Sequence, residues 1–335
     1  MMIRDRRFLG LVAAALLSLG NNSPASALDA FTVRDSWSVS GLQAGWYWAM
    51  NKGLFAKHGV SVALEDGNGS GVTVQLVNSG KFDVGHADLS VMAVARGKGM
   101  NLISIGGLIQ KTSIGVFVPK DSGIKTAKDL EGKEVIYTAT SFEGPFIDPF
   151  LKAGGTNRDK INLMSVDAAA KIPSYAAGKG DAMIVSIPFG MAYVQKTRPS
   201  NYILFGDYGL DLPSYGLVVT QDTLEKRGTG LKGLADAYFE AWQQIIDGGE
   251  SSAEEAASIL MKARPDAKLD REQLLISIRE HIKYFHTPNT ASKPLGYQSA
   301  EDWKRVIELM ENAALIPAGS KPDDYFTNKL IDGAK

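Results

Sequence analysis

The chain has 335 residues, with 36 lysines and arginines, 37 aspartates and glutamates, and no cysteine. Its formal net charge of −1 supplies no basic field to hold nucleic acid or an anionic membrane surface. Without cysteine there is no disulfide framework and no residue to carry the lipid of an exported lipoprotein, so we expect no direct membrane anchor. The length suits about two domains, and we expect a small molecule as partner.

The first 27 residues have the pattern of a cleavable signal peptide. A basic start, MMIRDRR, precedes the apolar run FLGLVAAALLSL, and Ala25-Ser26-Ala27 has the small-x-small form of a cleavage site. The run is too short for a membrane-spanning helix, which needs about 20 apolar residues. We therefore expect cleavage after about Ala27 and a mature chain in a bacterial periplasm.

Short strand-like runs alternate with helical ones from residue 30 to about 206. In the first block the predicted strands are 31–37, 60–66, 82–88 and 101–109, and the segment 41–59 is predicted as one helix. A second block has the strand-like runs IGVFVPK, KEVIYTA, INLMSVD and DAMIVS. Such close alternation is typical of a mostly parallel sheet covered by helices on both faces.

The two blocks share a phrase, LVNSGKFDVGHADLS near residue 80 and YAAGKGDAMIVSIPF near residue 180. Each has a small residue, then Gly-Lys-x-Asp, an apolar strand and the start of a helix. The repetition indicates two α/β lobes of related design.

The character of the chain changes after Asp211. One more strand is predicted over 215–224, followed by amphipathic helices over 231–247, 251–263, 270–285 and 299–313. We predict a first lobe from 28–111, a second lobe from 112–210, and a return to the first lobe over 211–335, with the helical tail packed on one lobe. Two crossings between the lobes would leave a cleft that closes by a hinge motion.

Motifs of catalysis are missing from the sequence. It contains no H-E-x-x-H, no G-x-S-x-G, no phosphate-binding G-x-x-x-x-G-K-[ST] and no cysteine nucleophile. His281 and His286 are five residues apart, about 140° around a helix, so they would not share a metal ion. We therefore expect a protein that is not an enzyme, with no cofactor and no metal.

Polar and aromatic residues follow the predicted strands, at the carboxyl ends where open α/β sheets bind ligands. Trp37 is expected to face the cleft, whereas Trp46 and Trp48 lie two apart inside a helix and are expected to be packing residues. Asp88 is also a candidate helix cap. The predicted ligand-binding residues are Trp37, Ser40, Gln43, Gly69, Ser70, Asp88, Thr140, Ser141, Phe142, Ser186, Phe189 and Tyr215.

Four segments, in this order, resemble one family: KGLFAKHGVSVAL, GNGSGVTVQLVNSGKFDVGHADLS, KDLEGKEVIYTATSFEGPFIDPFLKAGG and AAGKGDAMIVSIPF. It is the family of substrate-binding proteins of ABC importers for nitrate, alkanesulfonates and thiamine-pyrimidine precursors. The resemblance covers about residues 31–220. It implies a periplasmic-binding-protein fold of type II, a monomeric receptor that closes on its ligand, and an inner-membrane ABC permease as partner.

The sequence specifies the class of ligand less closely than it specifies the fold. The first loop is W-S-V-S-G-L-Q-A-G, where the pyrimidine-precursor branch resembles W-x-P-N-x-x-H-x-G. The predicted cleft loops carry Asp35, Asp66, Asp88 and Glu143, which favours a neutral or nitrogen-bearing ligand containing a ring. Two alternatives stay open: a receptor for an organic anion or nitrate, and an exported enzyme similar to the fungal pyrimidine synthase, whose cysteine-rich motif this sequence cannot supply.

Overall fold

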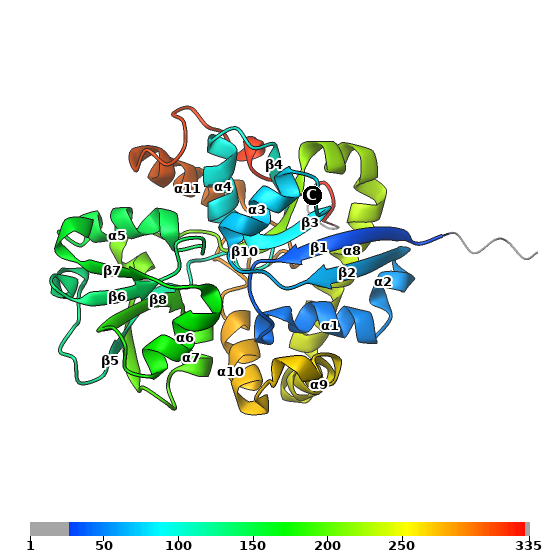
Figure 1. Ribbon diagram of the computed structural model, residues 1–335. Coiled ribbons are helices and arrows are strands. Elements are labelled where there is room, and N and C mark those ends of the chain that lie inside the picture. The colour runs from blue at the N-terminus through cyan, green and yellow to red at the C-terminus, as the bar shows by residue number, and fades with distance from the viewer. Residues whose placement is uncertain (1–26, 332–335) are drawn as a thin grey trace, which may run out of the picture.

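The computed structural model describes residues 27–331 and shows two lobes side by side (Figure 1). The predicted signal peptide lies outside the described residues, apart from Ala27. Within residues 27–331, no helix has both the length and the apolar character needed to cross a membrane.

The first lobe is built on a five-stranded sheet with the order β2-β1-β3-β10-β4. β1 runs parallel to β2 and β3, whereas β10 is antiparallel to both of its neighbours, β3 and β4. The strands are β1 (Asp29–Asp35), β2 (Val60–Glu65), β3 (Val84–Asp88), β4 (Leu102–Gly107) and β10 (Tyr215–Thr220).

The second lobe repeats this arrangement with the order β7-β6-β8-β5-β9. Here β6 is parallel to β7 and β8, and β5 is antiparallel to β8 and β9. The strands are β5 (Ile114–Pro119), β6 (Glu134–Tyr137), β7 (Asn162–Ser165), β8 (Ala182–Ser186) and β9 (Ser200–Leu204).

The single antiparallel strand of each sheet follows a crossing from the other lobe. β5 comes after the crossing that leaves β4, and β10 comes after the crossing that leaves β9 and the turn behind it. A chain that arrives from the other lobe starts its strand at the interlobe edge and so runs against the other strands. The predicted fold class, two lobes with mostly parallel sheets flanked by helices, is confirmed, and the residue limits of the lobes stay a proposal.

Helices cover both faces of each sheet (Figure 1). In the first lobe α3 and α4 pack on one face, and α8 packs with α1 and α2 on the other. The α-helices are α1 (Ala44–Asn51), α2 (Leu54–Lys57), α3 (Ser70–Asn78), α4 (Leu89–Gly97), α5 (Ile147–Ala153), α6 (Ala168–Ala176), α7 (Ile187–Tyr193), α8 (Gln221–Asp247), α9 (Gly249–Ala263), α10 (Arg271–Ile282) and α11 (Ala300–Asn312). The 3-10 helices are η1 (Gly41–Gln43), η2 (Ala127–Leu130), η3 (Gly144–Phe146), η4 (Arg158–Lys160), η5 (Phe205–Tyr208), η6 (Pro265–Ala267) and η7 (Pro322–Asp324).

The C-terminal helices do not all stay on one lobe. α10 packs against α9 and η1 of the first lobe and also against α7 of the second lobe, and Figure 1 shows it between α7 and α9. The expectation that the tail packs on one lobe therefore needs this addition: α10 bridges the two lobes.

Some predicted elements have different limits. The predicted helix over 41–59 is divided into η1, α1 and α2, with Gly53 between α1 and α2 at a φ of +68°. The predicted strand over 215–224 ends at Thr220, whose hydroxyl accepts a hydrogen bond from the Thr223 N–H at 3.0 Å and caps α8. β9 was not predicted, and it pairs with β5 at the edge of the second sheet.

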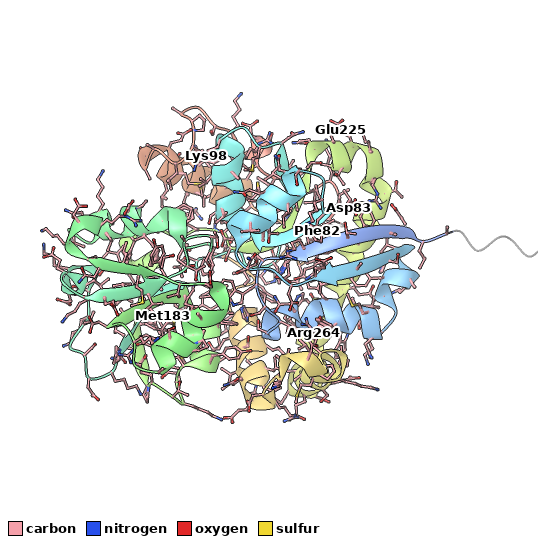
Figure 2. The ribbon with its side chains drawn as sticks, in the orientation of Figure 1. Phe82, Asp83, Lys98, Met183, Glu225 and Arg264 are labelled. Carbon is pink, nitrogen blue, oxygen red and sulfur yellow. The ribbon has the colours of Figure 1, made fainter. Side chains whose placement is uncertain are left out.

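Within residues 27–331, three apolar clusters form the interior: one within the first lobe, one within the second lobe, and one that contains residues of both lobes. In the first lobe, the fully buried Trp46 stacks on Phe55 with ring centroids 6.0 Å apart and lies 4.2 Å from the ring of Tyr238 on α8. In the second lobe, Met183 of β8 is buried in a separate cluster (Figure 2). Trp46 and Trp48 are buried, as the sequence predicts for packing residues.

Replacing Trp46 by alanine should destabilise the fold by about 3–5 kcal/mol, because it leaves a large cavity between α1 and α8. Met50→Ala on the same helix is the matched control. Its side chain is 36% exposed, and surface substitutions usually change stability by about 0.5 kcal/mol or less. Urea unfolding measures both, and equal effects would contradict this description of the core.

Candidate functional site

A small cavity lies between the lobes, at the carboxyl ends of the strands that carry the predicted site. Its volume of about 20 Å³ is little more than one water molecule needs. The first lobe and the C-terminal helices contribute Trp37, Ser40, Leu42, Gln43, Tyr215 and His281. The second lobe contributes Phe142, Lys171, Val185, Ser186 and Phe189. A ligand in this cavity would therefore touch both lobes.

Aromatic rings form much of its wall. Trp37 meets Phe189 of the other lobe edge to face, with ring centroids 6.1 Å apart. Phe142 of the second lobe meets Tyr215 of the first in the same way, also at 6.1 Å. Edge-to-face pairs of this kind are favourable and leave ring faces that a planar ligand can contact.

Gln43 presents a hydrogen-bond donor that no protein atom uses. Its Oε1 accepts hydrogen bonds from the Ser40 N–H at 2.7 Å and the Ser40 hydroxyl at 3.0 Å, in a capping box that opens η1. These bonds fix the orientation of the amide. The Nε2 group is buried without a hydrogen-bond partner, and Gln43 lines the cavity. Buried polar groups are rarely left unpaired, so this amide is suited to an acceptor atom of a ligand.

His281, in contrast to Gln43, supplies a hydrogen-bond acceptor to the cavity. Its Nδ1 donates to the Ser277 carbonyl oxygen at 2.7 Å, which leaves Nε2 without a proton in the neutral ring. Burial lowers the pKa of His281 to about 4, so the ring is neutral near pH 7.

Lys171 places a buried cation beside the aromatic wall. Its ammonium donates to Glu143 Oε1 and, at 3.3 Å, to the Ile184 carbonyl oxygen. It also lies 5.1 Å from the centroid of the Trp37 ring. Burial lowers the pKa of Lys171, and the Glu143 carboxylate opposes that shift.

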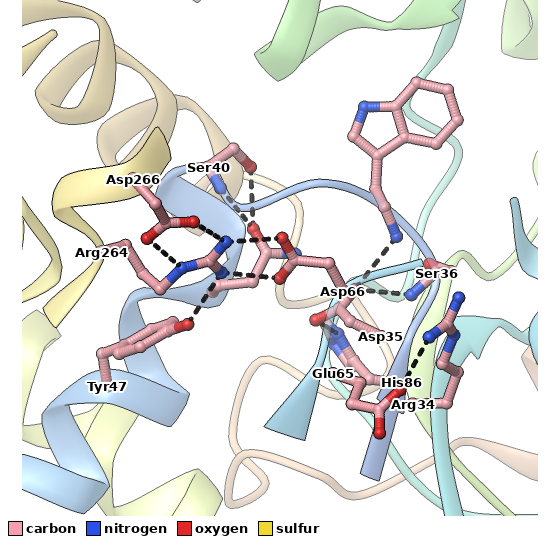
Figure 3. A network of polar contacts seen from close by, with 12 residues as sticks. Arg34, Asp35, Ser36, Ser40, Tyr47, Glu65, Asp66, His86, Arg264 and Asp266 are labelled. Carbon is pink, nitrogen blue, oxygen red and sulfur yellow. Dashed lines mark hydrogen bonds and ion pairs between the residues drawn. The ribbon is translucent and has the colours of Figure 1, made fainter. Parts of the chain in front are cut away.

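The loop that carries Trp37 is held by a buried polar chain (Figure 3). Asp35 Oδ1 accepts from the N–H groups of Ser36 at 2.7 Å and Trp37 at 3.3 Å. Asp35 Oδ2 lies 3.2 Å from His86 Nδ1, and His86 Nε2 lies 3.0 Å from the Tyr238 hydroxyl. Because a carboxylate only accepts, His86 donates to Asp35 from Nδ1.

A second cluster ties the next loop to the C-terminal helices (Figure 3). Arg264 donates to both carboxylate oxygens of Asp66, at 2.8 and 2.9 Å, and also to Asp266 and to the Tyr47 hydroxyl. Bidentate pairs of this kind fix geometry as well as charge.

The four acidic residues of the predicted cleft thus have protein partners. Asp35 caps its own loop, Asp66 pairs with Arg264, Asp88 caps α4, and Glu143 pairs with Lys171. Because these acids have roles within the protein, their number gives no argument against an anionic ligand, which removes one reason for the sequence-based preference for a neutral or nitrogen-bearing ligand.

The predicted site residues fall into two groups. Those that line the cavity are Trp37, Ser40, Gln43, Phe142, Ser186, Phe189 and Tyr215. The others, Gly69, Ser70, Asp88, Thr140 and Ser141, are not among its lining residues. Ser141 and Ser186 are both buried with hydroxyls that have no hydrogen-bond partner.

The loop 68–71 of the first lobe is hydrogen-bonded to Thr140 of the second lobe. The Gly71 N–H donates to the Thr140 carbonyl oxygen at 3.0 Å, and the Thr140 hydroxyl donates to the Asn68 carbonyl oxygen at 3.1 Å. Gly69 has a φ of +131°, and a Cβ atom there would lie 2.4 Å from the Thr140 carbonyl oxygen. These contacts belong to the closed arrangement of the lobes.

Asp88 is a helix cap whose oxygens are occupied by protein donors. Oδ1 accepts from the Ser90 N–H, the Ser90 hydroxyl and the Val91 N–H, and Oδ2 accepts from the Ser214 hydroxyl. The Asp88 N–H donates to the Ser70 hydroxyl oxygen at 3.1 Å. Burial raises the pKa of Asp88 to about 6, and these hydrogen bonds oppose the shift.

Sequence reasoning missed the polar lining residues Lys171 and His281. Lys171 lies four residues before the buried Tyr175 on α6, and His281 four residues after the buried Ser277 on α10. Residues four apart share a helix face, so a polar residue on an otherwise buried face was the available signal.

The two lobes, their strand orders and the two crossings between them define the periplasmic-binding-protein fold. Residues 42–251 match the family described as NMT1/THI5 like, and the chain belongs to that family. The predicted family is therefore confirmed.

Named relatives include both binding proteins and enzymes. The formylaminopyrimidine-binding protein of Halalkalibacterium halodurans is 21% identical over 331 residues, 96% of each chain. The 4-amino-5-hydroxymethyl-2-methylpyrimidine phosphate synthase of Aspergillus parasiticus is 31% identical over 132 residues, 39% of this chain and 38% of that one. Among solved structures, the alkanesulfonate-binding protein SsuA of Xanthomonas axonopodis pv. citri, bound to MOPS, is similar in fold, with a TM-score of 0.68 and 15% identity over 89% of this chain and 98% of that one.

Asp88→Asn should remove a pH dependence from stability. The folded-state pKa of about 6 exceeds the unfolded value of about 3.9, so the contribution of Asp88 is complete only below pH ~4 and is lost as the pH rises to about 6. The stability of the variant relative to the original chain should rise by up to about 3 kcal/mol between pH 4 and pH 7. Urea unfolding at both pH values measures this, and a constant difference would contradict the raised pKa, because it would mean that the hydrogen bonds cancel the effect of burial.

Gly69→Ala should shift the protein toward an open arrangement, because the added methyl group meets the Thr140 carbonyl. Gly80→Ala is the matched control: Gly80 also has a positive φ, +74°, but its Cβ would meet nothing within 4 Å. Small-angle X-ray scattering should give a larger radius of gyration for the first variant only. The same radius for both would remove this contact from the closure.

Proposed function

We propose that the chain is a monomeric periplasmic receptor that binds a small, ring-containing, neutral or nitrogen-bearing nutrient and delivers it to an ABC permease. The observation that carries the proposal is the unpaired Gln43 amide, held in a fixed orientation at an aromatic cavity between two lobes. The Ser186 hydroxyl, also buried, unpaired and lining the cavity, adds a second free polar group.

The chemistry of the lining supports this ligand class. Trp37 and Phe189 offer ring surfaces, Gln43 offers N–H donors, and the neutral His281 offers an acceptor nitrogen. The Lys171 charge is balanced by Glu143. A planar heterocycle with both acceptor and donor atoms matches this set, since pockets commonly combine apolar walls with a few placed polar groups.

The small cavity implies that a ring enters only after the lobes separate or side chains move. A second, larger space of about 340 Å³ adjoins it, lined on the two lobes by residues that include Ser38, Asp66, Tyr193 and Phe189. Phe189 lines both spaces, so a shift of its ring would connect them.

The alternative of an organic anion is favoured by one observation, the Lys171 ammonium at the cavity wall. Binding rather than turnover is proposed because one relative that matches over 96% of the chain is named as a binding protein, whereas the match to the Aspergillus parasiticus synthase covers 39% of this chain. Export through the predicted signal peptide and delivery to a permease are part of the same proposal.

Thermal-shift screening tests the ligand class. A ligand at about 100 times its dissociation constant adds about 2.7 kcal/mol of stability, so neutral aromatic heterocycles should raise the melting temperature by several degrees. Trp37→Ala should weaken binding of the best ligand at least about tenfold, whereas Met50→Ala should leave it unchanged. Shifts with organic anions alone would contradict the proposed ligand class, and turnover by the purified protein would contradict the receptor.

A further inference from the structure

Among the described residues that line the cavity, Lys171 alone has a side chain that is ordinarily charged at pH 7. It comes from α6 of the second lobe, and its side chain is fully buried. An ammonium at a cavity wall would ordinarily attract an anion. In this structure its hydrogen bonds go to Glu143 and to a backbone carbonyl.

Glu143 is placed to balance that charge. Its side chain is also fully buried, and its Oε1 accepts from Lys171 and from the Thr138 N–H at 3.3 Å. Glu143 is not among the residues that line the cavity, so it reaches a ligand only through Lys171. The pair therefore puts a cation at the wall with its counter-ion behind it.

This arrangement has a consequence for selectivity. A ligand anion that approaches Lys171 also meets the field of the buried Glu143 carboxylate a short distance behind, in a medium where charges are poorly screened. It must also give up its own hydration. A neutral ligand is repelled less by the Glu143 carboxylate and loses less hydration free energy than an anion does.

We propose that Glu143 is a specificity-determining residue: by neutralising Lys171 it makes the cavity reject organic anions and accept neutral polar ligands. This deepens the proposed function and rests on it, because it concerns the same cavity. Glu143 acts through Lys171 and is a positioning residue, not a ligand contact.

Glu143→Gln tests the proposal, because it keeps the shape of the side chain and removes only its charge. The variant removes the counter-ion that favours the charged form of Lys171, and a bound anion can take its place. Formate and formamide are a matched pair of small probes, and benzoate and benzamide are a matched pair with a ring. In the variant the anions should raise the melting temperature by several degrees more than the amides, with at least a tenfold preference by calorimetry.

The original chain should not prefer either anion over its matched amide. The double variant Glu143→Gln with Lys171→Met should lose the preference for anions that the single variant gains. Equal responses of the single variant to anion and amide would overturn the proposal, as would anion binding by the original chain or by the double variant. If Glu143→Gln folds only when formate is present, as measured by circular dichroism, the proposal is supported.

Should that variant fold under neither condition, Glu143→Asp carries the test. The shorter carboxylate weakens the pair without removing the charge, so a smaller gain in anion affinity is expected, and no gain would overturn the proposal. The formate measurements do not depend on the natural ligand. Failure of the original chain to bind any neutral heterocycle would therefore count against the proposed function, while a formate response in the variant would still support the role of Glu143.

Discussion

In each sheet one strand begins directly after the chain crosses from the other lobe, and this constraint determines where a ligand can bind. β5 and β10 start at the interlobe edge, so they run against the four strands whose carboxyl ends point to that edge. The loops after β1, β3, β6 and β8 consequently face one another across the cleft. Trp37, Phe142 and Phe189, which are far apart in the chain, line one cavity for this reason.

The polar groups that hold the loop of Trp37 differ from those that line the cavity. Asp35, His86 and Tyr238 use their polar atoms on one another and hold the loop of Trp37. At the cavity, in contrast, Gln43 and Ser186 keep polar atoms without partners. Unpaired buried groups are costly, and these two lie where a ligand or water can pair with them.

The sequence predicted the two-lobed fold and the side chains that follow strands, because both depend on local patterns. Trp37, Gln43 and Phe189 lie directly at the ends of strands or in the first turn after them, and all line the cavity. Lys171 and His281 come from the middle and end of helices, and only the packing of α6 and α10 brings them to the cleft. The partner of Asp66 could not be predicted for the same reason, since Arg264 lies 198 residues away in the chain. β9 is an edge strand of five residues, and the edge position left too little apolar alternation to predict it.

A crystal structure with a bound aminopyrimidine tests the central claim, that the interlobe cavity takes a neutral heterocycle, most directly. The account predicts the ring within about 4 Å of Trp37, with an acceptor atom within about 3.2 Å of Gln43 Nε2. It also predicts that the Lys171–Glu143 pair stays intact. A ligand bound outside this cavity, or one that separates Lys171 from Glu143, would contradict it.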